Sequence, residues 1–327
     1  MASTQISVIV LNFNGRQWLQ ACLDAVARQR NAPPFETILV DNASSDGSAA
    51  FVQERYPGVR LVRTRTNVGF AGGNNEGARA ARGEWLAFLN NDTQASPEWL
   101  ERLHAAAAAH PGYGLITSRI VFMDAPQTLD SAGDGYLRAG GAYKRGHGEP
   151  SAAYDESREV FGGCGAALLV RRDLFEELGG FDESFFMVYE DVDLSYRARL
   201  GGHRCWYAAD AIVRHAGSGT LGRLSASAVF YGQRNLEWTW IRNTPWPAIL
   251  TTAPAHVLYS LAGLAHYARL GLGGPAIGAK IAALKGLPAA LRARRRIQAA
   301  RRVSDRQLAP LMHRGWLTLK RDEKRAR

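Results

Sequence analysis

Two acidic segments of this 327-residue chain could bind a metal ion or accept a proton. One is Asn90-Asn91-Asp92-Thr93, which follows an apolar run. Mg²⁺ and Mn²⁺ prefer oxygen ligands, commonly one or two carboxylates together with the phosphate oxygens of a substrate. Asp92 could supply such an oxygen, and the two neighbouring amides could hydrogen-bond sugar hydroxyls. The same residue types also form turns at strand ends, so this segment alone leaves both interpretations open.

The other acidic segment places Glu190, Asp191 and Asp193 within four residues at the start of a predicted helix. The helix dipole stabilises acids at this position, which partly explains the cluster. Transfer of a sugar with inversion would also need a carboxylate there. Such a group takes the proton from the acceptor hydroxyl as it attacks the anomeric carbon, and a helix N-terminus would keep it ionised.

Two further segments have features of nucleotide-binding loops. Asp41 and Asn42 follow a second apolar run, and the Asp41 carboxylate could accept a hydrogen bond from a nucleobase N–H. The glycines of residues 67–75 (NVGFAGGNN) would let the backbone approach phosphate or sugar oxygens closely at a helix start. This segment is neither G-x-G-x-x-G nor a Walker loop, which argues against dehydrogenases and P-loop enzymes. His215, in a segment that ends at Ser218, could be structural or a ligand.

Alternating strands and helices are predicted to position these residues. Apolar runs predict strands at residues 6–11, 37–40, 59–62 and 85–89. Helical spacing and capping residues predict helices at residues 18–26, 48–56 and 72–81. This order is typical of a parallel sheet, in which ligands bind at the carboxyl ends of the strands. Asn12, Asp41 and Asp92 each lie just beyond such an end, so we expect them on one edge.

The second half of the chain is less regular. We predict a long loop at residues 124–159, order again over 160–170, helices at 172–178 and 190–200, and a short strand at 205–208. Residues 243–268 contain no Lys, Arg, Asp or Glu. Such a stretch could lie in a membrane interface, span a membrane or form a soluble helix, and its three prolines favour the interface.

Composition and charge limit the class of protein. Three scattered cysteines, without a C-x-x-C pair, argue against a disulfide framework and a cysteine zinc site, and favour a reducing compartment. The N-terminus shows no signal-peptide pattern. Residues 269–327 hold sixteen Lys and Arg against three acids, a balance of +13, so with +10 overall the first 268 residues carry −3. A basic C-terminal region could contact an anionic membrane, nucleic acid or only solvent.

Taken in order, six stretches resemble the family 2 glycosyltransferases, especially their bacterial rhamnosyltransferase-like branch. The resemblance covers roughly residues 5 to 245. Its stretches are residues 7–15 (SVIVLNFNG), 41–48 (DNASSDGS), 67–75 (NVGFAGGNN), 85–93 (WLAFLNNDT), 161–175 (FGGCGAALLVRRDLF) and 180–197 (GFDESFFMVYEDVDLSYR).

The resemblance implies a GT-A type α/β fold, with a mostly parallel Rossmann-like sheet flanked by helices. It also implies a nucleotide-diphosphate sugar donor, a divalent cation (Mg²⁺ or Mn²⁺) and inversion. Asp41 would contact the base, Asp92 and His215 the metal, and Asp191 would be the catalytic base. Asn90 stands where the family's D-x-D has its first Asp, which hints at dTDP-rhamnose as donor. Expected donor contacts are Asn12, Asp41, Asn42, Asn67, Gly73, Asn74, Asn90, Asn91 and Asp92, and expected acceptor contacts are Gly163, Glu190 and Asp193.

We therefore expect a catalytic domain over residues 1–240, with a nucleotide-sugar half to about 120 and an acceptor half beyond it. Residues 241–327 would form amphipathic, membrane-associated helices. The acceptor would be a glycan or a polyprenyl-linked glycan in cell-envelope polysaccharide synthesis, at the cytoplasmic face of the plasma membrane. Two alternatives are a module that binds a nucleotide sugar without turnover and a nucleic-acid-binding protein. The acidic cluster argues against the first, and the lack of a nucleic-acid motif argues against the second.

Overall fold

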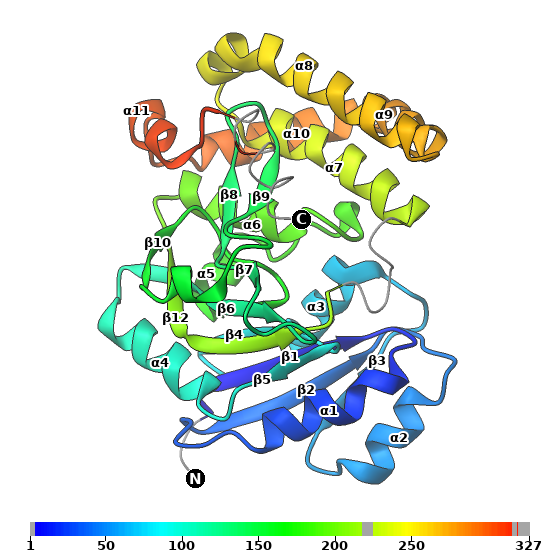
Figure 1. Cartoon of the computed structure of the whole chain (residues 1–327), viewed down its shortest axis with the longest axis vertical. Helices are drawn as coiled ribbons and strands as arrows, with labels where there is room; N and C mark the ends of the chain where they lie inside the picture. The colour runs from blue at the N-terminus through cyan, green and yellow to red at the C-terminus, as the bar shows by residue number, and fades with distance from the viewer. Residues whose placement is uncertain (1–3, 218–224, 316–318, 320–327) are drawn as a thin grey trace.

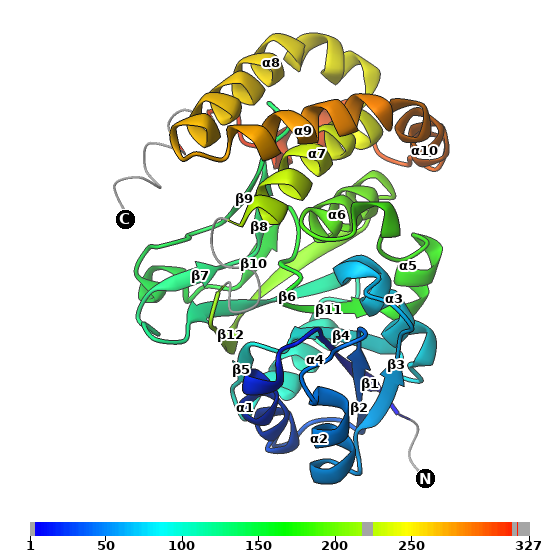
Figure 2. The same cartoon turned by 90° about the vertical axis from the view of Figure 1, so that its right-hand side faces the viewer.

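The computed structural model describes residues 4–217, 225–315 and 319. Ser218 and much of the basic C-terminus therefore lie outside the described residues. A ten-stranded sheet runs through the molecule, with the main strand order β10-β12-β6-β11-β4-β1-β2-β3. The chain is a mixed α/β structure in which helices flank this sheet and a group of C-terminal helices lies above it (Figures 1 and 2).

The first half is the parallel sheet that the sequence predicts. Its strands pair in the order β4-β1-β2-β3, and the apolar runs of β1, β2 and β4 are buried because helices cover the sheet, whereas the run in β3 is half-buried. The register places Asn12 opposite Asp41 and Leu11 opposite Asn90, so the predicted polar edge is confirmed. The elements are β1 (Ile6–Asn12), α1 (Arg16–Ala27), β2 (Phe35–Asp41), α2 (Ser48–Arg55), β3 (Arg60–Arg63), α3 (Gly69–Ala80) and β4 (Trp85–Asn90).

The second half continues the same sheet with mixed strand directions. β11 is antiparallel to both β4 and β6 and so joins the halves, while β12 runs parallel to β6. We did not predict α4 or β6, and β12 is longer than the strand predicted at 205–208. The elements are β5 (Thr93–Ala95), α4 (Trp99–Ala109), β6 (Tyr113–Phe122), β10 (Arg158–Val160), β11 (Ala167–Arg171), α5 (Arg172–Glu177), η2 (Glu183–Phe185), α6 (Glu190–Leu200) and β12 (Arg204–His215).

The segment predicted as one long loop, residues 124–159, contains short regular elements that the sequence did not predict. This segment forms β7 (Leu129–Ser131), β8 (Asp134–Tyr136), β9 (Ala142–Lys144) and the short helix η1 (Ser151–Tyr154). Each strand has three residues, which is too short to show a period of two in the sequence. The segment therefore carries ordered side chains to the edge of the sheet.

The C-terminal region is helical, as predicted. α7 packs against α9, α10 and α6, and the predicted boundary at residue 240 falls within its last turn. Among the described helices, α8 is long and apolar enough to cross a membrane by length and composition. The elements are α7 (Ala226–Asn243), α8 (Trp246–Arg269), α9 (Gly273–Lys285), α10 (Leu287–Ala299), α11 (Asp305–Leu308) and η3 (Ala309–Leu311).

Candidate active site

A cavity of about 540 Å³ lies at the polar edge of the sheet, between the two halves of the fold. Most of the residues predicted to do chemistry line it, from the ends of β2, β4 and β12 and the starts of α3 and α6. Those predicted residues are Asn42, Asn67, Asn90, Asn91, Asp92, Glu190, Asp191 and His215.

His215 and Asp92 are in direct contact in this cavity. His215 Nε2 lies 3.2 Å from Asp92 Oδ1, and both side chains are buried. The contact follows from strand pairing, because β12 runs antiparallel to β5 and places His215 opposite Thr93, the residue after Asp92. The sequence resemblance identifies both residues as metal ligands but does not relate them in space.

Asp130, which we did not predict, orients the His215 ring. Its Oδ2 accepts a hydrogen bond of 2.8 Å from His215 Nδ1, so that Nε2 faces Asp92. Lys144 Nζ lies 2.8 and 3.0 Å from the two Asp130 oxygens. Burial alone would raise the pKa of Asp130, but Lys144, His147 and His215 hold it well below its ordinary value. Asp130 is therefore an ionised hydrogen-bond acceptor.

The pair of Asp92 and His215 fits a divalent cation that also binds a substrate. Burial would lower the pKa of His215, but its hydrogen bonds to Asp130 and Asp92 raise it to about 9. The Asp92 carboxylate and the His215 imidazole thus face each other where a cation would bind. The described residues contain no group of three or more His, Cys, Asp and Glu side chains suited to a metal. Two protein ligands are enough where phosphate oxygens and water complete the shell.

Amide side chains form the rest of the nucleotide edge. Asn42 Nδ2 donates to Asn67 Oδ1 at 2.9 Å, and Asn42 Oδ1 accepts from the backbone N–H of Val68 at 3.0 Å. These bonds fix the start of α3 against the end of β2. Asn91 Nδ2 donates to Asn12 Oδ1 at 2.7 Å, which fixes the turn that carries Asp92.

Four of the predicted donor contacts lie behind the cavity wall. Asn12 supports Asn91 and Ser44, Asp41 lies 3.7 Å from Arg63 Nε, and Asn74 donates to the Phe70 carbonyl at 3.0 Å. A Cβ at Gly73 would lie 2.3 Å from Leu11 Cδ1, so the absence of a side chain there permits α3 to pack on β1. These residues support the residues that line the cavity.

Asp191 faces the cavity and is held by backbone donors. Its Oδ2 accepts from Gly165 N and its Oδ1 from Val192 N, both at 2.8 Å. Burial raises the pKa of Asp191 above its ordinary value, although these N–H groups oppose the change. A carboxylate with a raised pKa beside a cavity has the properties of a general base.

The other predicted acceptor contacts differ from one another. Glu190 lines the cavity, and its buried Oε2 has no hydrogen-bond partner among the described residues. Burial and the charge of Asp191 raise the pKa of Glu190 well above its ordinary value. Asp193 instead bonds Arg197 at 2.7 Å and Asn243 at 2.8 Å. A Cβ at Gly163 would meet Leu168. Neither Asp193 nor Gly163 lines the cavity, so their predicted acceptor contacts remain a prediction.

The segment immediately before Glu190 has a strained backbone. Phe186, Val188 and Tyr189 have φ angles of 65°, 65° and 79°, which a β-branched residue such as Val rarely adopts. Asn235 of α7 is fully buried and donates its amide to the carbonyls of Phe185, Met187 and Val188 at 3.0, 2.9 and 2.7 Å. Asn235 therefore stabilises the turn that directs Asp191 into the cavity.

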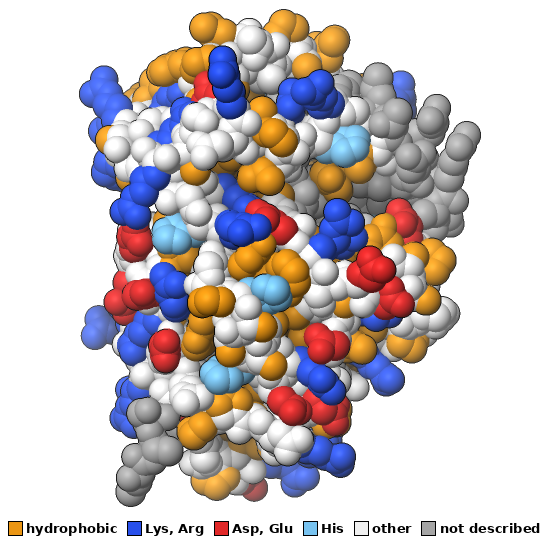
Figure 3. Space-filling model, turned by 90° about the vertical axis from the view of Figure 1, so that its left-hand side faces the viewer, with side chains coloured by type: hydrophobic (Ala, Val, Ile, Leu, Met, Phe, Trp, Pro, Cys, Tyr) orange, Lys and Arg blue, Asp and Glu red, His pale blue; other side chains and the backbone are white. Residues whose placement is uncertain are grey.

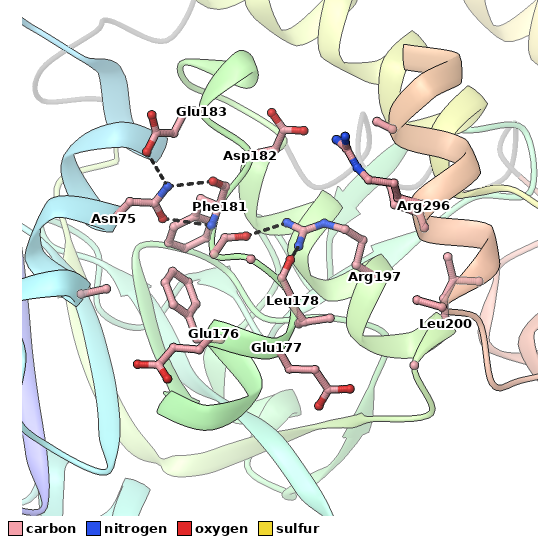
Figure 4. A pocket seen from close by; sticks show the side chains of 18 of the residues that line it. Asn75, Glu176, Glu177, Leu178, Phe181, Asp182, Glu183, Arg197, Leu200 and Arg296 are labelled. Atoms are coloured by element: carbon pink, nitrogen blue, oxygen red, sulfur yellow. Dashed lines mark hydrogen bonds between the residues drawn. The ribbon is translucent and has the colours of Figure 1, made fainter. Parts of the chain in front are cut away.

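A larger cavity of about 910 Å³ lies on the other side of this turn, between α3, α5 and α10 (Figure 4). Asn75 bonds the backbone of Phe181 there, and Arg197 bonds the carbonyls of Leu178 and Gly180. Several of its charged side chains pair with each other, as Arg79 does with Glu183. It contains none of the predicted site residues, so the smaller cavity is the candidate active site.

Known proteins resemble this chain in sequence. The model for Glycosyl transferase family 2 matches residues 7–179. The N-acetylglucosaminyl-diphospho-decaprenol L-rhamnosyltransferase of Mycobacterium tuberculosis is 32% identical over 222 residues, covering 59% of this chain and 70% of that protein. The O-antigen biosynthesis protein RfbC of Myxococcus xanthus is 29% identical over 221 residues, covering 64% of this chain and 17% of that protein.

Solved structures share the fold. The mannosyltransferase PcManGT from Pyrobaculum calidifontis, in complex with GDP-Man and Mn²⁺, superposes with a TM-score of 0.55 and 20% identity, covering 100% of this chain and 86% of that one. GalNAc-T7 with UDP, GalNAc and Mn²⁺ superposes with a TM-score of 0.59 and 16% identity, covering 73% of this chain and 48% of that one. At these identities the likeness is one of fold, and the fold is the GT-A type.

Proposed function

This chain belongs to glycosyl transferase family 2, and we propose that it moves a sugar from a nucleotide-diphosphate donor to an acceptor hydroxyl with inversion at the anomeric carbon. The observation that carries the proposal is one cavity lined by both the Asp92–His215 pair and Asp191. The Asp92–His215 pair can hold the charged donor. Asp191 can take the proton from the acceptor hydroxyl. Few other reactions need both features in one site.

Asp92 and His215 would hold a divalent cation, Mg²⁺ or Mn²⁺. When bound, the cation would offset the negative charge of the donor diphosphate and of the departing nucleotide. Asn42, Asn67 and the start of α3 would orient the nucleotide at the same edge of the sheet. The Mn²⁺ named with two structural neighbours supports this assignment.

Asp191 would act as the catalytic base. The acceptor hydroxyl loses its proton to an Asp191 oxygen as its own oxygen bonds the anomeric carbon, and the bond from that carbon to the diphosphate breaks. Gly165 N and Val192 N keep the carboxylate in one orientation. The buried Glu190 oxygen without a partner among the described residues is available to hydrogen-bond another group of the acceptor.

We propose rhamnose from dTDP-rhamnose as the donor sugar and a polyprenyl-diphosphate glycan as the acceptor. The name of the relative from Mycobacterium tuberculosis supports rhamnose as the sugar and a polyprenyl-diphosphate glycan as the acceptor, and the O-antigen relative supports a role in cell-envelope polysaccharide synthesis. Such an acceptor places the enzyme at the cytoplasmic face of the membrane. Residues 1–240 would be the catalytic domain and residues 241–327 the membrane-associated region.

A thermal-shift panel of nucleotide sugars, with and without Mn²⁺, tests the donor assignment. A ligand that binds only the native state raises the melting temperature. We expect dTDP-rhamnose with Mn²⁺ to give the largest shift, and Asp92→Ala to abolish it. A larger shift from another nucleotide sugar would overturn the rhamnose assignment, and no shift from any of them would overturn the donor site.

A further inference from the structure

The outer face of α8 and α9 is an exposed apolar surface. On α8 the exposed fractions are 55% for Trp246, 75% for Leu250, 60% for Leu258 and 55% for Leu261. Their spacing puts them on one side of the helix. Ile277, Ile281 and Leu284 of α9 are exposed in the same way, at positions separated by four and three residues. We call these seven residues the apolar platform. In Figure 3 hydrophobic side chains gather at the top of the molecule, where these helices lie.

The opposite face of α8 is attached to the rest of the molecule by polar contacts. His256 Nε2 lies 2.7 Å from Glu237 Oε2 of α7, and Ser260 Oγ donates to Glu237 Oε1 at 2.7 Å. The ring of His256 also stacks on Trp240 with centroids 3.7 Å apart. Lys280 of α9 donates to Glu237 as well, at 2.5 Å. One carboxylate thus joins α7, α8 and α9.

These contacts distinguish a helix that lies on a membrane from one that crosses it. To span a bilayer, α8 would have to leave α7, which would separate the His256–Glu237 pair and expose Ser260 and His256 to lipid. Burying such groups without partners is costly. A helix that lies flat keeps every one of these contacts and places only the apolar platform in the lipid.

The basic residues of this helical region favour a membrane with anionic lipids. Residues 238–304 contain no Asp or Glu. Arg269 and Lys285 stand at the ends of α8 and α9, and Arg292 and Arg295 are exposed on α10. Basic side chains beside an inserted apolar face attract anionic headgroups, each contributing about 1 kcal/mol near the surface.

We propose that the hairpin of α8 and α9 docks the protein flat on an anionic lipid bilayer, with the apolar platform inserted and neither helix crossing. The inference extends the proposed lipid-linked acceptor, because α7 connects the two regions. Ser227 and Tyr231 of α7 line the active-site cavity, and Glu237 of the same helix holds α8. The ten residue steps from Ser227 to Glu237 span about 15 Å of helix, so α7 joins the cavity to the helix that carries the platform.

Flotation of the full chain with lipid vesicles tests this proposal. We expect binding to phosphatidylcholine vesicles that contain phosphatidylglycerol, and much less to phosphatidylcholine alone. The double substitution Leu258→Glu with Leu261→Glu should lower the affinity for these vesicles by about a hundredfold. The reason is that two leucine side chains no longer insert into the lipid. The matched control is Ala105→Glu with Ala108→Glu, two exposed positions of α4, which lies away from α8 and α9 (Figure 1). Circular dichroism checks that each variant is folded.

Three results would overturn the proposal. One is an unchanged affinity in the platform variant, and another is resistance of the bound protein to alkaline carbonate, which marks a spanning helix. The third is that the protein does not bind vesicles but forms a concentration-dependent dimer, measured by light scattering, which only the platform variant abolishes. The platform would then bind a second copy of the chain. Release of nucleotide from the donor in solution, measured on the same variants, reports the proposed function separately.

Discussion

His215 Nε2 lies 3.2 Å from Asp92 Oδ1, although the two residues are far apart in the sequence. The antiparallel pairing of β5 with β12 brings them together, and Asp130 fixes the ring orientation. This contact is the basis on which we propose the pair as ligands of a divalent cation. The first predictions concern this pair.

Loss of either ligand should remove metal binding. We expect Asp92→Asn and His215→Ala each to weaken Mn²⁺ binding by more than about a hundredfold, measured with the nucleotide diphosphate present. Removing a residue that only hydrogen-bonds a metal ligand already costs tenfold to a hundredfold in metal affinity. Calorimetric titration provides the measurement. Asp155→Asn, an exposed carboxylate at the end of η1, is the matched control and should bind Mn²⁺ normally. Normal binding by both site variants would contradict the metal assignment.

Asp130 should act through His215. Asp130→Asn keeps the size of the side chain but removes the charge that orients the imidazole, so we expect Mn²⁺ affinity to fall by about tenfold. Activity at saturating Mn²⁺ should recover most of its normal value, since the ligands themselves remain. A loss of activity that no concentration of Mn²⁺ restores would show that Asp130 does more than position His215.

The pH dependence of transfer should report Asp191. The base must be ionised, and burial raises its pKa above 3.8. With Mn²⁺ saturating at each pH, the rate at saturating substrate should therefore fall with decreasing pH through an ionisation above that ordinary value. A rate that stays constant down to the ordinary pKa of an aspartate would contradict the role of Asp191.

Asn235 should hold the active-site turn in its strained conformation. Asn235→Ala removes three hydrogen bonds to backbone carbonyls, so we expect the free energy of unfolding to fall by about 1–3 kcal/mol. Because Asp191 follows this turn, kcat should fall more than the affinity for the donor. Chemical denaturation and steady-state kinetics measure the two effects.

A matched control for Asn235 is Gln298, which bonds the C-terminal end of α7. Gln298 of α10 also donates its amide to backbone carbonyls, those of Arg242 and Asn243, but lies away from the cavity. Gln298→Ala should lower stability without changing kcat. Equal loss of kcat in both variants would show that Asn235 contributes only stability.

The sequence predicts much of the fold's first half because each buried strand there is a continuous apolar run that ends in a polar residue. The strand pattern alone therefore places Asn12, Asp41 and Asp92 on one edge of the sheet. It does not place Asp130 and Lys144, since three-residue strands carry them and show no periodicity. A family resemblance identifies candidate reacting residues but not the residues that orient them.

Asp193 shows a second limit of prediction from sequence. Its carboxylate belongs to the same acidic cluster as Asp191, and the helix dipole favours both. Only packing distinguishes them, because Arg197 and Asn243 surround Asp193 while Asp191 faces the cavity. Asn235 shows the same limit, since its three acceptors are backbone carbonyls, which no side-chain pattern reveals.

The central claim is that one cavity binds the donor through the metal pair and deprotonates the acceptor through Asp191. Sugar transfer by Asp191→Asn, measured beside donor binding in the presence of Mn²⁺, tests it most directly. We predict that kcat falls by about a hundredfold to ten-thousandfold while donor affinity is unchanged, because only the proton acceptor is lost. Transfer at the normal rate by a folded Asp191→Asn variant would contradict the claim.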